Sequence, residues 1–180
     1  MRILVIFTFD YSLKSWKDAG YLDRELHFYN SLSANYGIKF TFLTYGDNGE
    51  FKYLLDNKNI EVIPIYSLIK FSKFKFIRYF KSFYLPFLFN KKYKDYDLIK
   101  QNQLLGSWVA IILKLISKKN LLIRTGYDMY KFSIEEKKNI FKKSLYYILT
   151  FISLRLADIY TVTSMSDLKF LKEVFKSRTV

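Results

Sequence analysis

The sequence contains no cysteine and only one histidine, His27. Without cysteine there are no disulfides, no thiolate metal ligands and no cysteine nucleophile, which fits a reducing compartment such as the cytoplasm. A single histidine inside a predicted helix argues against a histidine-rich metal site and against a Ser–His–Asp triad. We therefore predict no metal site.

Glycine is also scarce, with six residues in 180, and proline occurs only twice. The first predicted strand is followed by one glycine, Gly20, within TFDYSLKSWKDAGY. A dinucleotide site of the G-x-G-x-x-G type needs several glycines there, because the backbone must approach a pyrophosphate closely. The P-loop, H-E-x-x-H and G-x-S-x-G patterns are missing as well. We expect no bound cofactor.

Long apolar runs are missing too. The two longest apolar stretches cover roughly residues 104–116 and 145–154. Each is shorter than the roughly 18–20 residues that span a bilayer. The first nine residues resemble a strand, and no cleavage site for a signal peptide follows them. The sequence thus predicts a cytoplasmic protein, either free or peripheral to the inner face of the membrane.

Positive charge, in contrast, is abundant. The formal net charge is +14 and the isoelectric point is about 9.7. Such a surface attracts phosphorylated ligands, acidic lipid headgroups or nucleic acid. A coding bias toward Lys, Ile, Asn, Phe and Tyr is an alternative source of the same charge.

Short apolar segments alternate with helical patterns along the chain. Continuous apolar character, rather than alternation, is typical of strands covered on both faces. The pattern predicts an α/β fold: a Rossmann-like, doubly wound, mostly parallel sheet of about six to seven strands with helices on both faces. The predicted strands are Arg2–Phe7, Phe40–Thr44, Ile60–Ile65, Leu98–Gln101, Leu121–Arg124 and Ile159–Thr163.

Helices are predicted between many of these strands. Residues 21–36 end at Gly37, a natural stop, and residues 104–117 are apolar almost all round. Ser133 with Glu136 predicts a capping box for a helix over 134–156. Ser164 with Asp167 gives a similar signal for a last helix.

Residues 66–96 interrupt this rhythm with a mixture of aromatic and basic residues. Tested as one helix, the basic residues scatter around the axis instead of forming one face. Three interpretations stay open: helices that cover the sheet, contact with a membrane surface, or stacking on nucleic acid bases.

Polar residues gather in four loops expected at the carboxyl ends of strands. Residues 10–20 form a long loop before a helix whose first N–H groups could bind an anion, unless the loop is only a mobile surface segment. Residues 46–50 have the composition of a turn. Residues 101–107 carry amides suited to hydroxyl-rich ligands, and residues 124–128 combine arginine, glycine and aspartate. The alternatives are a capping loop and a structural Arg–Asp pair.

Taken in order, several segments resemble the N-terminal domain of retaining glycosyltransferases with the two-lobe GT-B architecture, of the family 4 (group 1) type. The resemblance covers nearly the whole chain, and no single segment carries it alone. The segments are MRILVIFTF, DAGYLDRE, GIKFTFLTYG, DLIKQNQLLGSWVA, LLIRTGYD and LRLADIYTVTSMSDLKFL.

The resemblance implies candidate site residues. It places Asp18, Gly20, Asn102, Gln103, Arg124, Gly126 and Tyr127 along the cleft for acceptor and donor. Many relatives have a histidine in the loop that matches RTGYD; here Asp128 is the tentative catalytic replacement.

The resemblance also implies a function. Residues 1–180 would be one acceptor-side lobe, without the donor lobe and its E-x7-E pair, of an enzyme that moves sugar from a nucleotide sugar to a glycan or lipid-linked acceptor. Cell-surface polysaccharide synthesis is the expected setting, and this lobe alone should be inactive. Expected partners are those substrates, a separate C-terminal lobe or a second copy, and an anionic membrane. The alternative is a non-catalytic module that binds a membrane or partner; nucleic-acid binding is the weakest alternative.

Overall fold

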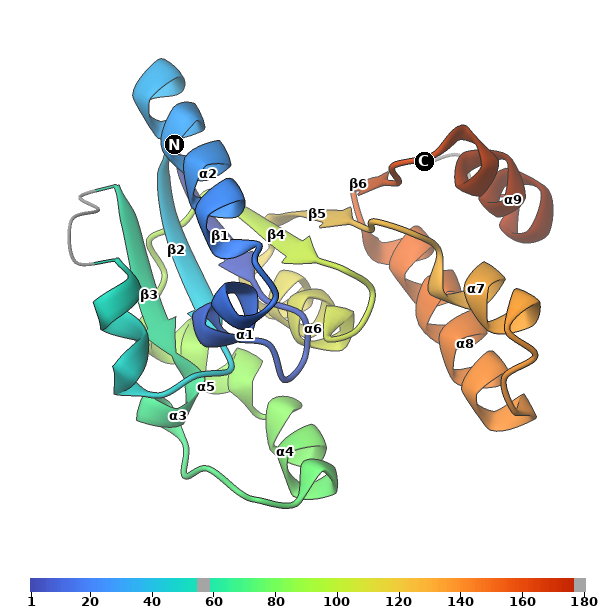
Figure 1. The fold of residues 1–180 in the computed structure, drawn as a ribbon, viewed down its shortest axis with the longest axis horizontal. Helices are drawn as coiled ribbons and strands as arrows, with labels where there is room; N and C mark the ends of the chain where they lie inside the picture. Colours follow the sequence, from blue (N-terminus) through green and yellow to red (C-terminus); the bar gives the residue numbers. More distant parts are fainter. Residues whose placement is uncertain (55–58, 177–180) are drawn as a thin grey trace.

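Six short strands form one parallel sheet in the computed structural model, which describes residues 1–54 and 59–176 (Figure 1). All five neighbouring pairs are parallel, and the order is β3-β2-β1-β4-β5-β6. The predicted doubly wound parallel fold is thereby confirmed. The strands are β1 Arg2–Ile6, β2 Lys39–Thr44, β3 Ile60–Pro64, β4 Leu98–Asn102, β5 Asn120–Arg124 and β6 Ile159–Thr161.

Alternate residues of the strands enter two separate hydrophobic cores, as the period of a strand requires. In β1, Leu4 and Ile6 belong to one core, while Ile3 and Val5 belong to the other. The first core contains residues of α5, α6 and α8, and the second contains residues of α1 and α2. These helices are α1 Leu13–Asp18, α2 Leu22–Tyr36, α5 Leu85–Lys92, α6 Ser107–Ser117 and α8 Ile140–Leu156.

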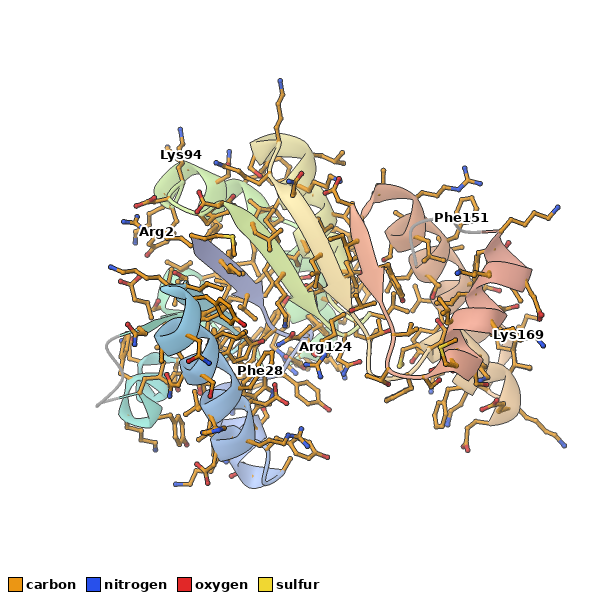
Figure 2. All side chains as sticks on the ribbon, turned by 90° about the horizontal axis from the view of Figure 1, so that it is seen from above. Arg2, Phe28, Lys94, Arg124, Phe151 and Lys169 are labelled. Atoms are coloured by element: carbon orange, nitrogen blue, oxygen red, sulfur yellow. The ribbon has the colours of Figure 1, made fainter. Side chains whose placement is uncertain are left out.

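The face that carries α1 and α2 is only partly covered. Seen from above, β4, β5 and β6 lie between α2 and the carboxyl-terminal helices, with α6 on their far side (Figure 2). Accordingly, Arg124 is exposed, Leu122 is only half-buried and Ile159 is 51% exposed. The direction of the crossovers explains this asymmetry. Right-handed connections that move from β1 to β3 place their helices on one face, and those that move from β4 to β6 place theirs on the other.

Two helices replace the single helix predicted over Ile134–Leu156. The predicted start of that helix is therefore wrong. Helix α7 covers Met129–Glu135, and Asp128 caps it. Helix α8 then begins after Asn139, whose side chain accepts a hydrogen bond from the third backbone N–H of the new helix. Ser133 does not act as a cap, because its hydroxyl donates to a carbonyl of α7.

Other helix ends agree with the sequence. Gly37 ends α2 in the left-handed conformation, with φ of +62°. Ser164 caps the last helix, α9 Met165–Phe175, by accepting from the Asp167 backbone N–H. Helix α9 packs against α7 through a Lys131–Asp167 ion pair at 3.0 Å.

The aromatic and basic stretch over residues 66–96 forms three short helices instead of one. They are α3 Ile65–Leu68, α4 Lys75–Ser82 and α5, which contains Pro86 in its first turn. A test of amphipathicity over one continuous helix therefore does not apply to this segment. Over the described part of the chain, no helix is long and apolar enough to cross a membrane.

Candidate functional site: a cavity at the carboxyl edge of the sheet

The loops that follow β1, β4 and β5 enclose a cavity of about 480 Å³. It lies at the carboxyl edge of the sheet, beside the point where the strand order reverses between β1 and β4. Ligands of doubly wound folds bind at such a point, because the neighbouring loops diverge there. This carboxyl-edge cavity is lined by Thr8, Tyr11, Trp16, Tyr21, Arg24, Glu25, Asn102, Gln103, Leu105, Arg124, Gly126, Tyr127 and Met129.

Five of the eight residues predicted from the sequence lie in the wall of this cavity. They come from two loops that are far apart in the sequence, residues 102–103 and residues 124–127. Arg124 stands at the end of β5, between α2 and the carboxyl-terminal helices (Figure 2). Parallel pairing of β4 with β5, with Asn102 opposite Arg124, brings the two loops together. The five residues are Asn102, Gln103, Arg124, Gly126 and Tyr127.

The other three predicted residues lie outside the cavity wall. Asp18 accepts a hydrogen bond from Lys14 Nζ at 2.5 Å on the surface of α1. Gly20, with φ of +72°, makes the turn between α1 and α2, and this turn brings the adjacent Tyr21 to the cavity. Asp128 is only 1% exposed.

Backbone contacts fix the loop after β1 against the loop after β4. The Thr8 hydroxyl donates to the Asn102 carbonyl at 3.0 Å, and the Phe9 N–H donates to the Leu105 carbonyl at 3.0 Å. Gly106 makes this approach feasible. A Cβ atom at that position would lie 2.9 Å from the Phe9 nitrogen.

Gln103 connects the loops after β4 and β5. Its side-chain oxygen accepts a hydrogen bond from the Gly126 N–H at 3.0 Å, and its own N–H donates to the Arg124 carbonyl at 2.8 Å. A Cβ atom on Gly126 would lie 3.1 Å from the Gln103 amide nitrogen, so glycine suits this contact. Gln103 therefore positions the wall of the cavity, while Arg124 and Tyr127 remain exposed to it.

A buried lysine lies behind Asn102. Lys100 is 9% exposed, and its ammonium donates to the Tyr29 hydroxyl at 2.8 Å and to Asn102 Oδ1. Both of these oxygens are neutral, so the positive charge of Lys100 adds to that of Arg24 and Arg124 near the cavity. Sequence reasoning overlooked this lysine. Its signal was a cation inside an otherwise apolar strand.

The region of α1 and α2 contributes four of the eight wall residues that sequence reasoning missed, Trp16, Tyr21, Arg24 and Glu25; the others are Thr8, Tyr11, Leu105 and Met129. Trp16 stacks on Phe7, with ring centroids 4.2 Å apart, which fixes the indole at one side of the cavity. Tyr21 is 49% exposed, and the Arg24 guanidinium lies 5.1 Å from its ring centroid. Arg24 also pairs with Glu25 at 3.0 Å. Trp16 lies within the predicted loop over residues 10–20 and the other three follow that loop directly, which was their only signal.

The predicted loop over residues 10–20 contains a short helix, α1, which the sequence did not predict, and the first N–H groups of α1 are not free. The helix that follows this loop is α2, whose N-cap Tyr21 makes no side-chain capping hydrogen bond, and an anion site at its amino end stays a prediction. The Glu50 carboxylate, 3% exposed, accepts from the Leu13 N–H at 2.7 Å and from the Lys14 N–H at 3.2 Å. Ser12 accepts from the Ser15 N–H in a capping box. The chain thus provides its own anion at this helix end. The predicted turn at residues 46–50 leads into a 3-10 helix, η1 Asn48–Tyr53, which presents Glu50.

Asp128 holds the start of α7 and does not border the cavity. One carboxylate oxygen accepts from the Lys131 N–H at 2.7 Å, and the other, Oδ2, is buried without a hydrogen-bond partner among the described residues. Burial raises the pKa of this carboxyl, and the hydrogen bond from the Lys131 N–H opposes the shift. The geometry makes Asp128 the cap of α7, the helix that follows the loop with Arg124.

This raised pKa has a consequence for stability. The folded state binds a proton on Asp128 more tightly than the unfolded state does, so the contribution of this group to stability is greatest below about pH 4 and is lost as the pH rises through the raised pKa. We expect Asp128→Asn, which keeps the capping oxygen, to make the decline between pH 4 and pH 7 shallower in urea unfolding. An equal decline in both proteins would contradict this role for the charge.

A second cavity, of about 360 Å³, lies at the opposite, amino edge of the sheet. Arg2, Lys39 and Glu61 line it together with Asp95, and it contains none of the predicted site residues. Within residues 1–54 and 59–176, no group of three or more His, Asp or Glu side chains could hold a metal ion.

No protein-family model matches the chain, and no curated protein sequence matches it. Solved structures do match. A short-chain dehydrogenase/reductase (wide type) from Veillonella parvula, in complex with NADP, aligns with a TM-score of 0.50 and 10% identity, over 89% of this chain and 67% of that chain. The lipopolysaccharide outer core galactosyltransferase WaaB, in its apo form, aligns with a TM-score of 0.45 and 16% identity.

The galactosyltransferase alignment covers 89% of this chain, which spans 38% of the length of that protein. At identities this low, structural likeness reports the fold and not the reaction. The chain therefore shares the Rossmann-like, doubly wound parallel sheet with the dehydrogenase of known structure.

Proposed function

We propose that this chain is the acceptor-side lobe of a glycosyltransferase of the two-lobe GT-B architecture, with a retaining reaction of the family 4 type. The observation that carries the proposal is the carboxyl-edge cavity. It unites, in one wall, residues 102–103 and 124–127, which belong to two of the segments that resemble this family.

The lining of the cavity suits a hydroxyl-rich acceptor that carries an anionic group. The exposed Tyr21 and Tyr127 rings can pack on the apolar face of a sugar, and the nearby amides can bond hydroxyls. Arg124 presents a guanidinium that can bind a phosphate or carboxylate through two hydrogen bonds. A lipid-linked sugar diphosphate combines these features, and the transferred sugar would come from a nucleotide sugar held by a second lobe.

An NADP-dependent oxidoreductase, which the dehydrogenase alignment could suggest, is a poorer fit to these residues. A dinucleotide pyrophosphate in such folds lies on the amino end of the helix after β1, beside glycines. Here the first N–H groups of α1 bind Glu50 and Ser12, and a second anion at that place would be repelled by the Glu50 carboxylate. The residues present do not form a dinucleotide site.

The test is a calorimetric titration of the chain with a sugar diphosphate that carries a short alkyl chain. We expect measurable binding, weakened at least about tenfold by Arg124→Ala, because a bidentate charged contact contributes about 1.5–3 kcal/mol. Tyr127→Ala should weaken binding less. Arg155→Ala, which removes an exposed arginine at the end of α8, is the matched control.

Two outcomes would count against the acceptor-lobe proposal. One is binding that is unaffected by Arg124→Ala, and the other is no binding to any glycosyl phosphate at millimolar concentration. Both variants change exposed side chains, so circular dichroism should confirm that each protein is folded before the titration is interpreted.

A further inference from the structure

Positive charge is concentrated in two parts of the chain that contain no acid. Residues 62–94 hold eight Lys and Arg residues and neither Asp nor Glu, and residues 137–157 hold five Lys and Arg residues, again without an acid. Segregation of this kind produces local positive potential rather than a mixed surface. The first segment contains helices α3 to α5. The second begins just before α8 and includes the whole of that helix.

Aromatic rings are exposed in the first of these segments. Phe76 and Phe80, one turn apart on α4, are 70% and 56% exposed, and their ring centroids lie 4.5 Å apart. Phe83, at the end of α4, and Phe87, in α5, are 36% and 52% exposed. We call the following set the basic–aromatic surface: Lys70, Phe71, Lys73, Phe74, Lys75, Phe76, Phe80, Tyr84 and Phe87.

The opposite side of α4 is held firmly on the body of the protein. The Arg78 guanidinium binds the Asp10 carboxylate through two hydrogen bonds, at 2.8 and 2.5 Å, and both side chains are more than 80% buried. Tyr79 packs on Trp108, whose indole N–H donates to Ser82 Oγ at 2.8 Å. The outward rings are therefore fixed in place by the inward contacts of the same helix.

A second exposed apolar and basic site lies on the same side of the molecule. The amino end of α8 carries Ile140, 73% exposed, and Phe141, 82% exposed, next to Lys142 and Lys143. Figure 1 shows α4 and the first turns of α8 both at the lower side of the molecule, while α9 lies at its upper side. A flat surface could touch both sites at once.

We propose that the basic–aromatic surface, together with the amino end of α8, docks this protein on an anionic lipid bilayer. Lysines attract acidic headgroups at about 1 kcal/mol each, while the neighbouring rings enter the boundary with the acyl chains. The exposed rings line neither of the two cavities described above. Exposed rings interleaved with lysines match the boundary between anionic headgroups and acyl chains.

The docked orientation would also bring the carboxyl-edge cavity close to the bilayer. Asp10, which holds α4 through Arg78, belongs to the loop after β1, and Thr8 and Tyr11 of that loop line the cavity. A substrate with a lipid anchor could then reach the cavity without leaving the membrane. This consequence depends on the proposed function, whereas membrane docking itself does not.

The experiment is co-sedimentation of the chain with two kinds of vesicle. One is phosphatidylcholine alone, and the other is phosphatidylcholine with about 30% of the anionic lipid phosphatidylglycerol. We expect binding to the anionic vesicles only. The double variant Lys73→Gln/Lys75→Gln should lower the partition coefficient about tenfold or more. The double variant Phe74→Ser/Phe76→Ser should lower the partition coefficient at high salt as well as at low salt, because contact of the rings with the acyl chains is not screened by salt. Because all four side chains are exposed, these variants should stay folded.

The matched controls remove lysines and a phenylalanine outside the basic–aromatic surface. Lys169→Gln/Lys172→Gln gives an equal loss of charge on α9, and Phe51→Ser removes a half-exposed ring on η1. Equal effects of the α4 and α9 lysine pairs would overturn the proposal, since they would indicate general attraction. So would stronger retention on DNA than on anionic vesicles, or binding that Phe74→Ser/Phe76→Ser leaves unchanged.

Discussion

Replacing Glu50 by alanine is expected to lower the free energy of unfolding by about 2–4 kcal/mol, because the buried Leu13 N–H and the partly buried Lys14 N–H at the start of α1 lose a charged acceptor. Urea unfolding followed by circular dichroism measures the effect. Glu50 lies 37 residues from its partner Leu13 and packs against Gly46, where a Cβ atom would meet the Glu50 side chain at 2.3 Å. The carboxylate thus joins the loop after β2 to the first helix.

Two further variants make this prediction specific. Glu50→Gln keeps one acceptor oxygen and turns an NH₂ group toward the other N–H, so its loss should be intermediate. Glu173→Ala, which removes an exposed carboxylate on α9, should change stability by less than about 0.5 kcal/mol. A loss for Glu50→Ala as small as that of Glu173→Ala would show that water replaces the carboxylate.

Removing the Phe7 ring should have the largest effect of the changes considered, a loss of about 3–5 kcal/mol for Phe7→Ala. Phe7 is fully buried, stacks on Trp16 at 4.2 Å and lies 5.4 Å from the Phe42 ring. The cavity left behind would also free the indole, and Trp16 forms one side of the carboxyl-edge cavity. We therefore expect weaker binding of the sugar diphosphate along with the lost stability.

Thermal unfolding and the same calorimetric titration separate these two effects. Phe7→Leu should keep most of the core volume and cost less stability, yet it removes the aromatic stack under Trp16. Phe51→Ala, at a position 50% exposed, is the control and should alter neither quantity appreciably. Unchanged ligand binding in a folded Phe7→Leu protein would mean that the indole keeps its position without the stack.

Local pattern was sufficient to predict the sheet. Strands such as Phe40–Thr44 and Leu121–Arg124 were identified to within one residue of the observed β2 and β5, because runs of apolar residues between polar loops are typical of buried parallel strands. Parallel pairing then places every carboxyl end at one edge. The polar loops after β4 and β5 were expected at that edge for this reason, and the resemblance to GT-B glycosyltransferases placed their residues along a cleft.

Boundaries set by competing caps were harder to predict. Ser133 and Asn139 both have side chains able to cap a helix, and the sequence does not say which of them is already engaged. In the folded chain, Ser133 lies inside a helix that Asp128 starts, and only Asn139 is free to start α8. The choice depends on where the loop after β5 ends.

The sequence alone determined the fold class and the edge of the sheet at which the polar loops gather, because these follow from hydrophobic periodicity and chain direction. The five wall residues were named from those loops and from the resemblance to GT-B glycosyltransferases. Only the tertiary structure decided which distant groups meet there. Glu50 binds the first N–H groups of α1, and the Lys100 ammonium of β4 donates to the Tyr29 hydroxyl of α2. The same holds for α4, where Arg78 binds Asp10 and thereby turns the phenylalanines outward. Contacts between residues 37–68 positions apart leave no local pattern in a sequence, and for that reason they could not be predicted.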